Sequence, residues 1–117
     1  MTSSEMTPAA IAEFYFECWA AGDPAPLRDL LHPDVTFDGA LGSTRGPDEF
    51  LEGLAGMFAA TESNTVRLRL ASDDDVITWS ELRIGDSAPM QVANWTHVEG
   101  GRIVAVRATF DPRPMLA

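Results

Sequence analysis

The stretch that decides the fold is Gln91–Phe110, which reads QVANWTHVEGGRIVAVRATF. Runs of β-branched and aromatic residues lie on both sides of Gly100-Gly101, and such a pair of runs around a glycine turn is typical of a β-hairpin. If the turn centres on Gly100, Asn94 faces Val106 across the two strands. We therefore expect one face of the hairpin to be apolar except for the Asn94 amide, and the other face to carry Trp95.

A second hairpin precedes the first one. Apolar and polar residues alternate on both sides of the acidic turn Asp73–Asp75, which is the period of two that β-strands have. With this turn at the centre, Arg67 faces Glu81 in an ion pair and Arg69 faces Trp79 in a cation–π contact. The C-terminal half of the chain is thus predicted to form four antiparallel strands.

The N-terminal half has the periodicity of helices. Thr7 and Pro8 are typical of a helix start, and apolar residues spaced three and four apart predict a helix over Pro8–Ala21. The elements expected after it are a short helix over 23–32, a short strand over Asp34–Asp38, a glycine-rich loop over 39–46, and a third helix from Pro47 to about Thr61.

These elements predict an α+β fold in one domain over residues 1–117. Three N-terminal helices cover one face of a curved, mostly antiparallel sheet and close a cone-shaped core with one open mouth. Pairing of the two hairpins places Ser80 beside Asn94 on this inner face. The apolar side chains expected on the same face are Leu68, Leu82, Val92, Val106 and Phe110.

The outer face of the sheet is left with an apolar patch, formed by Ile77, Trp79, Trp95, Ile103 and Ala105. Patches of this kind mark interfaces, so we expect a homodimer that forms through Trp79, Trp95 and Ile103. The alternative is that the C-terminal tail of the chain, with its two prolines, covers the patch. His97 points to this face, where we expect it to make a dimer contact.

Composition excludes several classes of partner. Eighteen acidic residues against eight basic ones give a formal net charge of −10, which repels nucleic acids and anionic membrane surfaces. No run of about 20 apolar residues is present, and the N-terminus has no signal-peptide pattern, so we expect a cytoplasmic protein without a membrane partner. Two histidines on separate elements and one cysteine give no metal spacing, and no phosphate-binding glycine motif is present, so no cofactor is expected.

Four segments resemble the nuclear transport factor 2-like superfamily. They are Tyr15–Asp23, Leu30–Asp38, Arg45-Gly46 and Gly100–Ile103. More narrowly, the chain is similar to the branch that holds ketosteroid isomerases, SnoaL-like polyketide cyclases and limonene-epoxide hydrolases. The resemblance covers nearly the whole chain and implies the same cone-shaped fold, which hosts many chemistries as well as plain binding domains.

The resemblance to ketosteroid isomerases implies three catalytic residues, Asp38, Tyr15 and Asn94. Tyr15 falls where those enzymes keep a tyrosine that donates a hydrogen bond to the developing enolate, and Asn94 falls where they keep a protonated aspartic acid. An ungapped count puts Gly39 at the position of their general base, whereas a shift by one residue puts Asp38 there. A carboxylate at the rim of an apolar cavity is suited to moving a proton between carbon atoms, and deeper donors stabilise the oxyanion.

The rest of the cavity wall is expected to bind the substrate through Phe110, Val106, Val92, Trp19 and Phe58. The predicted function is that of a small enzyme without a cofactor, which binds an apolar carbonyl compound of steroid, polyketide or terpenoid type. It moves a proton as an isomerase or as a cyclase, and in the cyclase either Asp38 or Asp111 serves as the acid–base group. The alternative is a non-catalytic domain for ligand binding or dimerisation.

Epoxide opening is not expected of this chain. The charged trio of limonene-epoxide hydrolases falls near Ser80, Leu82 and Ala108, and none of these residues carries a charge. His32 lies before Pro33 at the end of the predicted short helix, where a structural hydrogen bond to the last carbonyls is expected.

Overall fold

The computed structural model describes residues 6–116 and confirms the α+β fold. The helices are α1 (Pro8–Ala21), the 3₁₀ helix η1 (Ala25–Leu30), α2 (Gly46–Ala60) and the short α3 (Arg113–Leu116). The strands are β1 (Leu31–Gly39), β2 (Gly42–Arg45), β3 (Thr61–Ala71), β4 (Asp75–Ile84), β5 (Met90–Glu99) and β6 (Arg102–Thr109). Residues 1–5, which bear on the expected absence of a signal peptide, lie outside the described residues.

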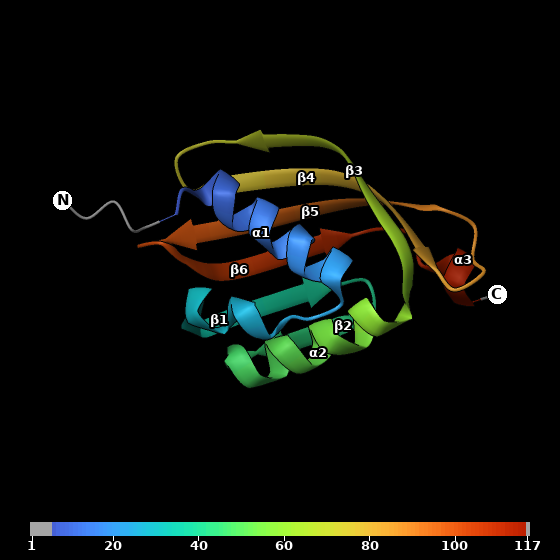
Figure 1. Ribbon diagram of the computed structural model, residues 1–117, viewed down its shortest axis with the longest axis horizontal. Helices are drawn as coiled ribbons and strands as arrows, with labels where there is room; N and C mark the ends of the chain where they lie inside the picture. The colour runs from blue at the N-terminus through green and yellow to red at the C-terminus, as the bar shows by residue number, and fades with distance from the viewer. Residues whose placement is uncertain (1–5, 117) are drawn as a thin grey trace.

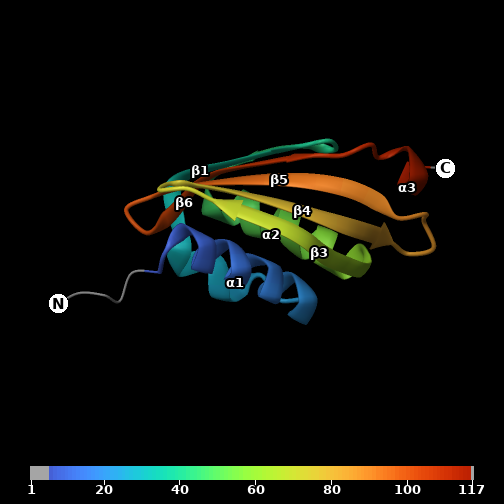
Figure 2. The same cartoon turned by 90° about the horizontal axis from the view of Figure 1, so that it is seen from above.

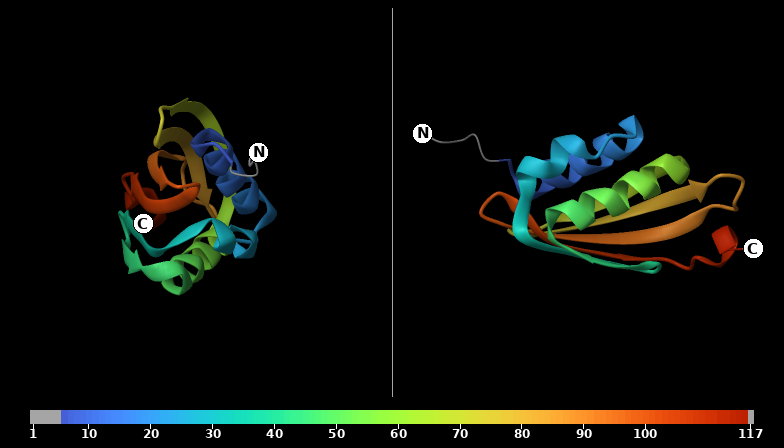
Figure 3. Two further views of the ribbon diagram at one scale, coloured as in Figure 1. Left: turned by 90° about the vertical axis from the view of Figure 1, so that its left-hand side faces the viewer. Right: turned by 90° about the horizontal axis from the view of Figure 1, so that it is seen from below.

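The six strands form one sheet in the order β2-β1-β6-β5-β4-β3. All neighbouring strands are antiparallel except β1 and β6, which pair in parallel. The helices α1 and α2 lie on the same face of this sheet (Figures 1 and 2). Seen end-on, the sheet curls around the two helices, so that they fill its concave side (Figure 3, left).

Local sequence signals set the ends of the long helices. The Thr7 hydroxyl accepts a hydrogen bond from the Ala10 N–H at the start of α1, and Gly22 ends that helix with a φ of 75°. At the start of α2, the Glu49 carboxylate accepts the Arg45 N–H at 2.9 Å and complements the positive end of the helix dipole. Both helices lie within one residue of their predicted ends.

The segment between the long helices differs from its prediction. The expected short helix is a 3₁₀ stretch that ends at Leu30, and β1 follows directly, because Pro33 is compatible with an extended chain but not with a continued helix. The expected loop over 39–46 contains β2, which pairs with β1. His32 caps no helix, since its Nδ1 accepts the Asp34 N–H at 3.0 Å within β1.

The turn of the β5–β6 hairpin is centred between Gly100 and Gly101 and not on Gly100, so its register differs from the predicted one. Gly100 and Gly101 form its two-residue turn with φ angles of 58° and 78°, which glycine adopts without strain. An extra residue in β6 then shifts the register once more, so that Asn94 pairs with Ala108 and not with Val106.

This bulge in β6 also turns Ile103 toward the core, where it is fully buried. The predicted place of Ile103 in the outer apolar patch is therefore wrong, because a bulge reverses the alternation of side chains along a strand. The large side chains of the predicted patch that remain on the outer face are 41–46% exposed, namely Ile77, Trp79 and Trp95.

The β3–β4 hairpin contains a bulge between Val66 and Leu68. Leu68 pairs with Trp79 and is exposed, so its predicted place on the inner face is wrong. The predicted ion pair between Arg67 and Glu81 is confirmed, with 3.1 Å between Nη2 and Oε1, because both long side chains reach across the shifted register.

Arg69 is turned to the inside of the fold by the same bulge. Its Nε donates to the hydroxyl of the buried Thr78 at 3.0 Å, and its guanidinium lies over the Phe16 ring, 5.2 Å from the ring centroid. The cation–π contact predicted with Trp79 is thus made with another aromatic ring.

The core lies between the helices and the concave face. Its fully buried side chains include Ile11 and Tyr15 from α1, Phe50 from α2, and Val35, Leu82 and Val106 from the strands. The tail after β6 also contributes, since Met115 in α3 packs against this core. Within residues 6–116, no helix has the length and the apolar character that crossing a membrane requires.

Candidate ligand-binding site

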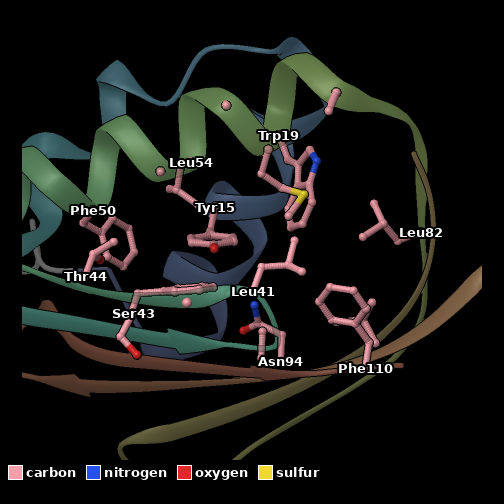
Figure 4. Close-up of a pocket in the computed structure, with 18 of the residues that line it drawn as sticks. Tyr15, Trp19, Leu41, Ser43, Thr44, Phe50, Leu54, Leu82, Asn94 and Phe110 are labelled. Carbon is pink, nitrogen blue, oxygen red and sulfur yellow. The ribbon is translucent and has the colours of Figure 1, made fainter. Parts of the chain in front are cut away.

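A large cavity opens between the two long helices and the concave face of the sheet (Figure 4). Its volume of about 720 Å³ is within the range of small-molecule sites. Aromatic side chains make up much of the wall, namely Phe16, Trp19, Phe37, Phe50 and Phe110. Such a wall removes apolar ligand surface from water and therefore favours hydrophobic compounds.

Tyr15 contributes a phenol from α1 to this cavity. It is 1% exposed, and its ring lies edge-on to the rings of Trp19 and Phe50, with centroids 6.2 and 6.5 Å away. Burial raises the pKa of the Tyr15 phenol well above its ordinary value, and a hydrogen bond from Asn94 lowers this pKa by a smaller amount. The phenol therefore stays protonated at neutral pH and can donate a hydrogen bond.

Asn94 contributes an amide from the inner face of β5, where it is 2% exposed. The Thr96 hydroxyl donates to Asn94 Oδ1 at 3.0 Å, so the amide oxygen already has a partner. The amide nitrogen is turned toward the cavity and Tyr15 (Figure 4). The structure thus brings together two of the three residues that the resemblance singles out.

Asp38 does not reach the cavity, and its predicted place at the cavity rim is wrong. The alternation of β1 turns Phe37 inward and Asp38 outward. The Asp38 carboxylate pairs with the Arg107 guanidinium at 3.0 Å and accepts a hydrogen bond from the Ser43 hydroxyl at 2.6 Å. The next position of β1 that faces inward after Phe37 is Gly39. This is the residue that the ungapped count aligns with the general base of ketosteroid isomerases.

Asp111, the second acid considered for a cyclase, also lies away from the cavity wall. It is exposed after the end of β6 and pairs with Arg113 at 2.6 Å. The hydrogen bonds from Arg113 hold the pKa of the Asp111 carboxyl below its usual range. The interaction of Asp111 with Arg113 therefore lies within the C-terminal segment and not at the cavity.

Three of the five residues predicted for the wall line the cavity, namely Phe110, Val92 and Trp19. The Trp19 ring is held in place because its Nε1 donates to the Thr61 hydroxyl at 2.8 Å. Phe58 stacks on Trp19 with centroids 5.2 Å apart, and Val106 is fully buried in the core. Phe58 and Val106 do not line the cavity, so their predicted place in its wall is wrong.

Sequence reasoning missed part of the wall. Phe50, Leu54 and Met57 line it from α2, and their spacing of four and three residues is a helical signal that locates them on one face. Phe37 follows from the alternation of β1. Met115 also lines the cavity but has no sequence signal, because the C-terminal tail carries no periodic pattern.

The acidic residues in the wall are Glu49 and Glu52, both exposed on α2. Glu49 is held by the Arg45 N–H at 2.9 Å, whereas Glu52 has no hydrogen bond or ion pair with another described residue. Among residues 6–116, the carboxylates that line the cavity therefore come from α2 and not from the end of β1.

His97 lies on the outer face of the sheet between two carboxylates. Its Nδ1 is 2.7 Å from Asp75 and its Nε2 is 2.8 Å from Glu99. The hydrogen bonds with Asp75 and then with Glu99 raise the pKa of the His97 imidazole above its ordinary value. The Trp95 Nε1 donates to the same Asp75 oxygen at 2.8 Å, and this bond and the one from His97 lower the pKa of the Asp75 carboxyl.

Comparisons with known proteins agree with this architecture. The sequence profile of the SnoaL-like domain matches residues 12–106. An NTF2-like protein of unknown function from Cytophaga hutchinsonii superposes with a TM-score of 0.85 at 17% identity, covering 99% of this chain and 100% of that chain. A steroid delta-isomerase from Pseudomonas aeruginosa superposes with a TM-score of 0.80 at 22% identity, covering 96% and 85%.

An LEH-like epoxide hydrolase from M. tuberculosis is also similar in structure, with a TM-score of 0.75 at 20% identity and coverage of 93% of this chain and 86% of that chain. Identities this low establish a shared fold and no shared activity. No curated protein sequence matches the chain.

Proposed function

Because the chain belongs to the SnoaL-like domain family of the nuclear transport factor 2-like superfamily, we propose that its cavity binds an apolar compound through a ketone or phenol oxygen. The observation that carries this proposal is the meeting of the Tyr15 hydroxyl and the Asn94 amide within a largely apolar wall. Two buried donors at one place select a ligand with an oxygen there, since an unpaired buried donor is unfavourable.

The size and the chemistry of the cavity support a ligand of two or more fused rings. A volume of about 720 Å³ exceeds what a single ring fills, and the aromatic wall offers stacking and edge contacts to flat or fused-ring compounds. The net charge of −10 favours a neutral ligand over an anionic one. Steroid-, polyketide- and terpenoid-like ketones meet these conditions.

A second candidate function is proton transfer on such a ketone, as an isomerase or a cyclase. The Tyr15 phenol and the Asn94 amide are placed to stabilise the enolate oxygen that forms when a proton leaves the neighbouring carbon. The observation that favours this candidate is the presence of Glu49 and Glu52 in the wall, either of which supplies a base. A protein of the same fold from Pseudomonas aeruginosa is a steroid delta-isomerase, so this fold is compatible with proton transfer on a ketone.

Binding is tested with 2-naphthol and naphthalene, which differ by one hydroxyl group, by isothermal titration calorimetry. Wild type should bind 2-naphthol about tenfold more tightly than naphthalene, because one hydrogen bond in a buried site contributes about 1.4 kcal/mol. Tyr15→Phe should remove this difference. Trp79→Phe on the outer face is the matched control and should leave it unchanged. Equal affinities of wild type for the two compounds contradict the proposal.

Catalysis is tested by exchange of the α-protons of 2-tetralone in deuterated water, followed by proton NMR. Proton transfer in the cavity predicts faster exchange with wild type than with Tyr15→Phe, and a loss of rate in Glu49→Gln or Glu52→Gln. Asp38→Asn is expected to leave the rate unchanged, because the Asp38 carboxylate faces Arg107 on the outer side. A rate that depends on Asp38 rules out the assignment of the base to α2.

A further inference from the structure

The Ser80 hydroxyl is a buried polar group for which the described residues provide no hydrogen-bond partner. Ser80 lies on β4 and is 1% exposed, and it belongs to the wall of the cavity. Buried hydroxyl groups in folded proteins nearly always have a partner, so a hydroxyl without one at a cavity wall points to a ligand atom as the partner.

The sheet register places Ser80 one step away from the Tyr15–Asn94 pair. Asn94 pairs with Thr78 on β4, and Ser80, two residues further along, pairs with Val92 on β5. Thr78 and Ser80 therefore point to the same inner face, and Ser80 is a diagonal neighbour of Asn94 at about 7–8 Å. This separation is about the width of two fused six-membered rings.

We infer that the ligand carries a second oxygen, as a hydroxyl or a carbonyl, which the Ser80 hydroxyl binds while Tyr15 and Asn94 hold the first. This inference rests on the proposed binding function and narrows the ligand to a fused-ring diol, hydroxyketone or diketone. The Ser80 hydroxyl can donate or accept a hydrogen bond, so it suits either form of oxygen.

Three other polar side chains with unpaired atoms are weaker choices for this role, and the first of them, Arg69, does not line the cavity. The hydroxyl of Thr44 lacks a partner and also lines the cavity, but Thr44 is only half-buried and belongs to the edge strand β2. Both amide atoms of Asn64 lack a partner, but Asn64 does not line the cavity. Of residues 6–116, Ser80 alone combines full burial, an unpaired hydroxyl and a place in the wall.

The test compares 2-naphthol with 2,6-naphthalenediol and 2,7-naphthalenediol on wild type, Ser80→Ala and Thr44→Val, by calorimetry. At least one diol should bind wild type about tenfold more tightly than 2-naphthol does. This gain should vanish in Ser80→Ala and persist in Thr44→Val, which is the matched loss of a hydroxyl elsewhere in the wall. The affinity of each protein for 2-naphthol is the baseline from which the gain with the diols is calculated.

The outcomes separate this inference from the proposed function. If 2-naphthol binds in a Tyr15-dependent manner and neither diol gains affinity, or if the gain survives in Ser80→Ala, the second oxygen site is refuted and the binding function stands. If 2-naphthol does not bind, or binds Tyr15→Phe equally well, both are refuted. Thermal unfolding verifies that Ser80→Ala is folded, and Ser80→Cys, which keeps a weaker polar group, should retain a smaller part of the gain.

Discussion

The ring of Phe37 occupies the space that any side chain at position 39 would need. A Cβ atom built on Gly39 lies 2.7 Å from Phe37 Cε1, well inside the contact distance of two carbon atoms. The position at the end of β1 that the ungapped count aligns with a general base is therefore filled by an aromatic ring, and this part of the wall is apolar. The site is better suited to holding an oxygen than to removing a proton from this side.

We predict that Gly39→Ala destabilises the fold through this contact. The free energy of unfolding should fall by about 1–3 kcal/mol, because a methyl group is forced against a packed ring. In a Phe37→Leu background, Gly39→Ala should lower the free energy of unfolding by at least about 1 kcal/mol less than in wild type. Urea unfolding of wild type, the two single variants and the double variant measures this coupling. Gly56→Ala in α2 is the control and should not destabilise, since a Cβ atom there meets nothing within 4 Å. Equal costs in both backgrounds contradict the contact.

The ionisation of Tyr15 can be followed directly, because it is the single tyrosine of the chain. Burial raises its pKa, so native protein should show no tyrosinate absorbance near pH 10, where the urea-unfolded chain titrates. Asn94→Leu should raise the pKa further, since it removes a hydrogen bond that favours the phenolate.

The stability of the protein follows from the same pKa shift of Tyr15. The unfolded chain loses the phenol proton first, so the free energy of unfolding is unaffected below about pH 10 and falls as the pH rises toward the folded-state pKa. Native absorbance that titrates near pH 10 would mean that solvent reaches the phenol, which is incompatible with its burial.

His97 should make the stability depend on pH near neutrality. Its folded-state pKa is raised above the unfolded value of about 6.5, so the stabilisation is complete below that value and is lost as the pH rises through the folded pKa. His97→Gln should therefore be more destabilising at about pH 6 than at about pH 9, as measured by urea unfolding. In an Asp75→Asn, Glu99→Gln background this difference should disappear, and a cost independent of pH contradicts the assignment.

The exposed patch of Ile77, Trp79 and Trp95 leads us to propose a homodimer formed through the outer face of the sheet. Sedimentation equilibrium should give twice the monomer mass for wild type and the monomer mass for Trp79→Glu, because a buried unpaired charge opposes association. Leu116→Glu is the control, since Leu116 is exposed on α3 and not on the sheet. A monomeric wild type at high concentration refutes the proposal.

Periodicity predicted most of the secondary structure and failed where the chain inserts a residue. The spacing of apolar residues indicated the helix α1, Thr7-Pro8 and Gly22 indicated its ends, and the Gly100-Gly101 turn indicated the last hairpin. Alternation cannot reveal a bulge, so one extra residue in β6 moved Ile103 to the core, and another in β3 moved Arg69 inside. The strand β2 was missed because three glycines in eight residues are typical of a loop.

The positions of Tyr15 and Asn94 in the cavity were predictable from the sequence. The position of Asp38 at the cavity rim was predicted although the alternation of β1 argues against it. The resemblance placed Tyr15 and Asn94 correctly in one cavity. The sequence itself explains why Asp38 does not line the cavity. Val35 and Phe37 both belong to the apolar side of β1, and a period of two then sends Asp38 to the opposite face. Ser80 was expected on the inner face, but its lack of a partner depends on three-dimensional packing and has no sequence signal.

The parallel pairing of β1 with β6 has a consequence for how the protein is made. The side-chain hydrogen bond between Arg107 and Thr36 joins positions 71 residues apart, and the sheet order requires β6 to enter between β1 and β5. In a growing chain, β1 has no partner on its β6 side until residues 102–109 have been made, so we expect completion of the sheet to be a late, non-local step of folding. The cavity, whose wall joins both halves of the chain, forms only at that step.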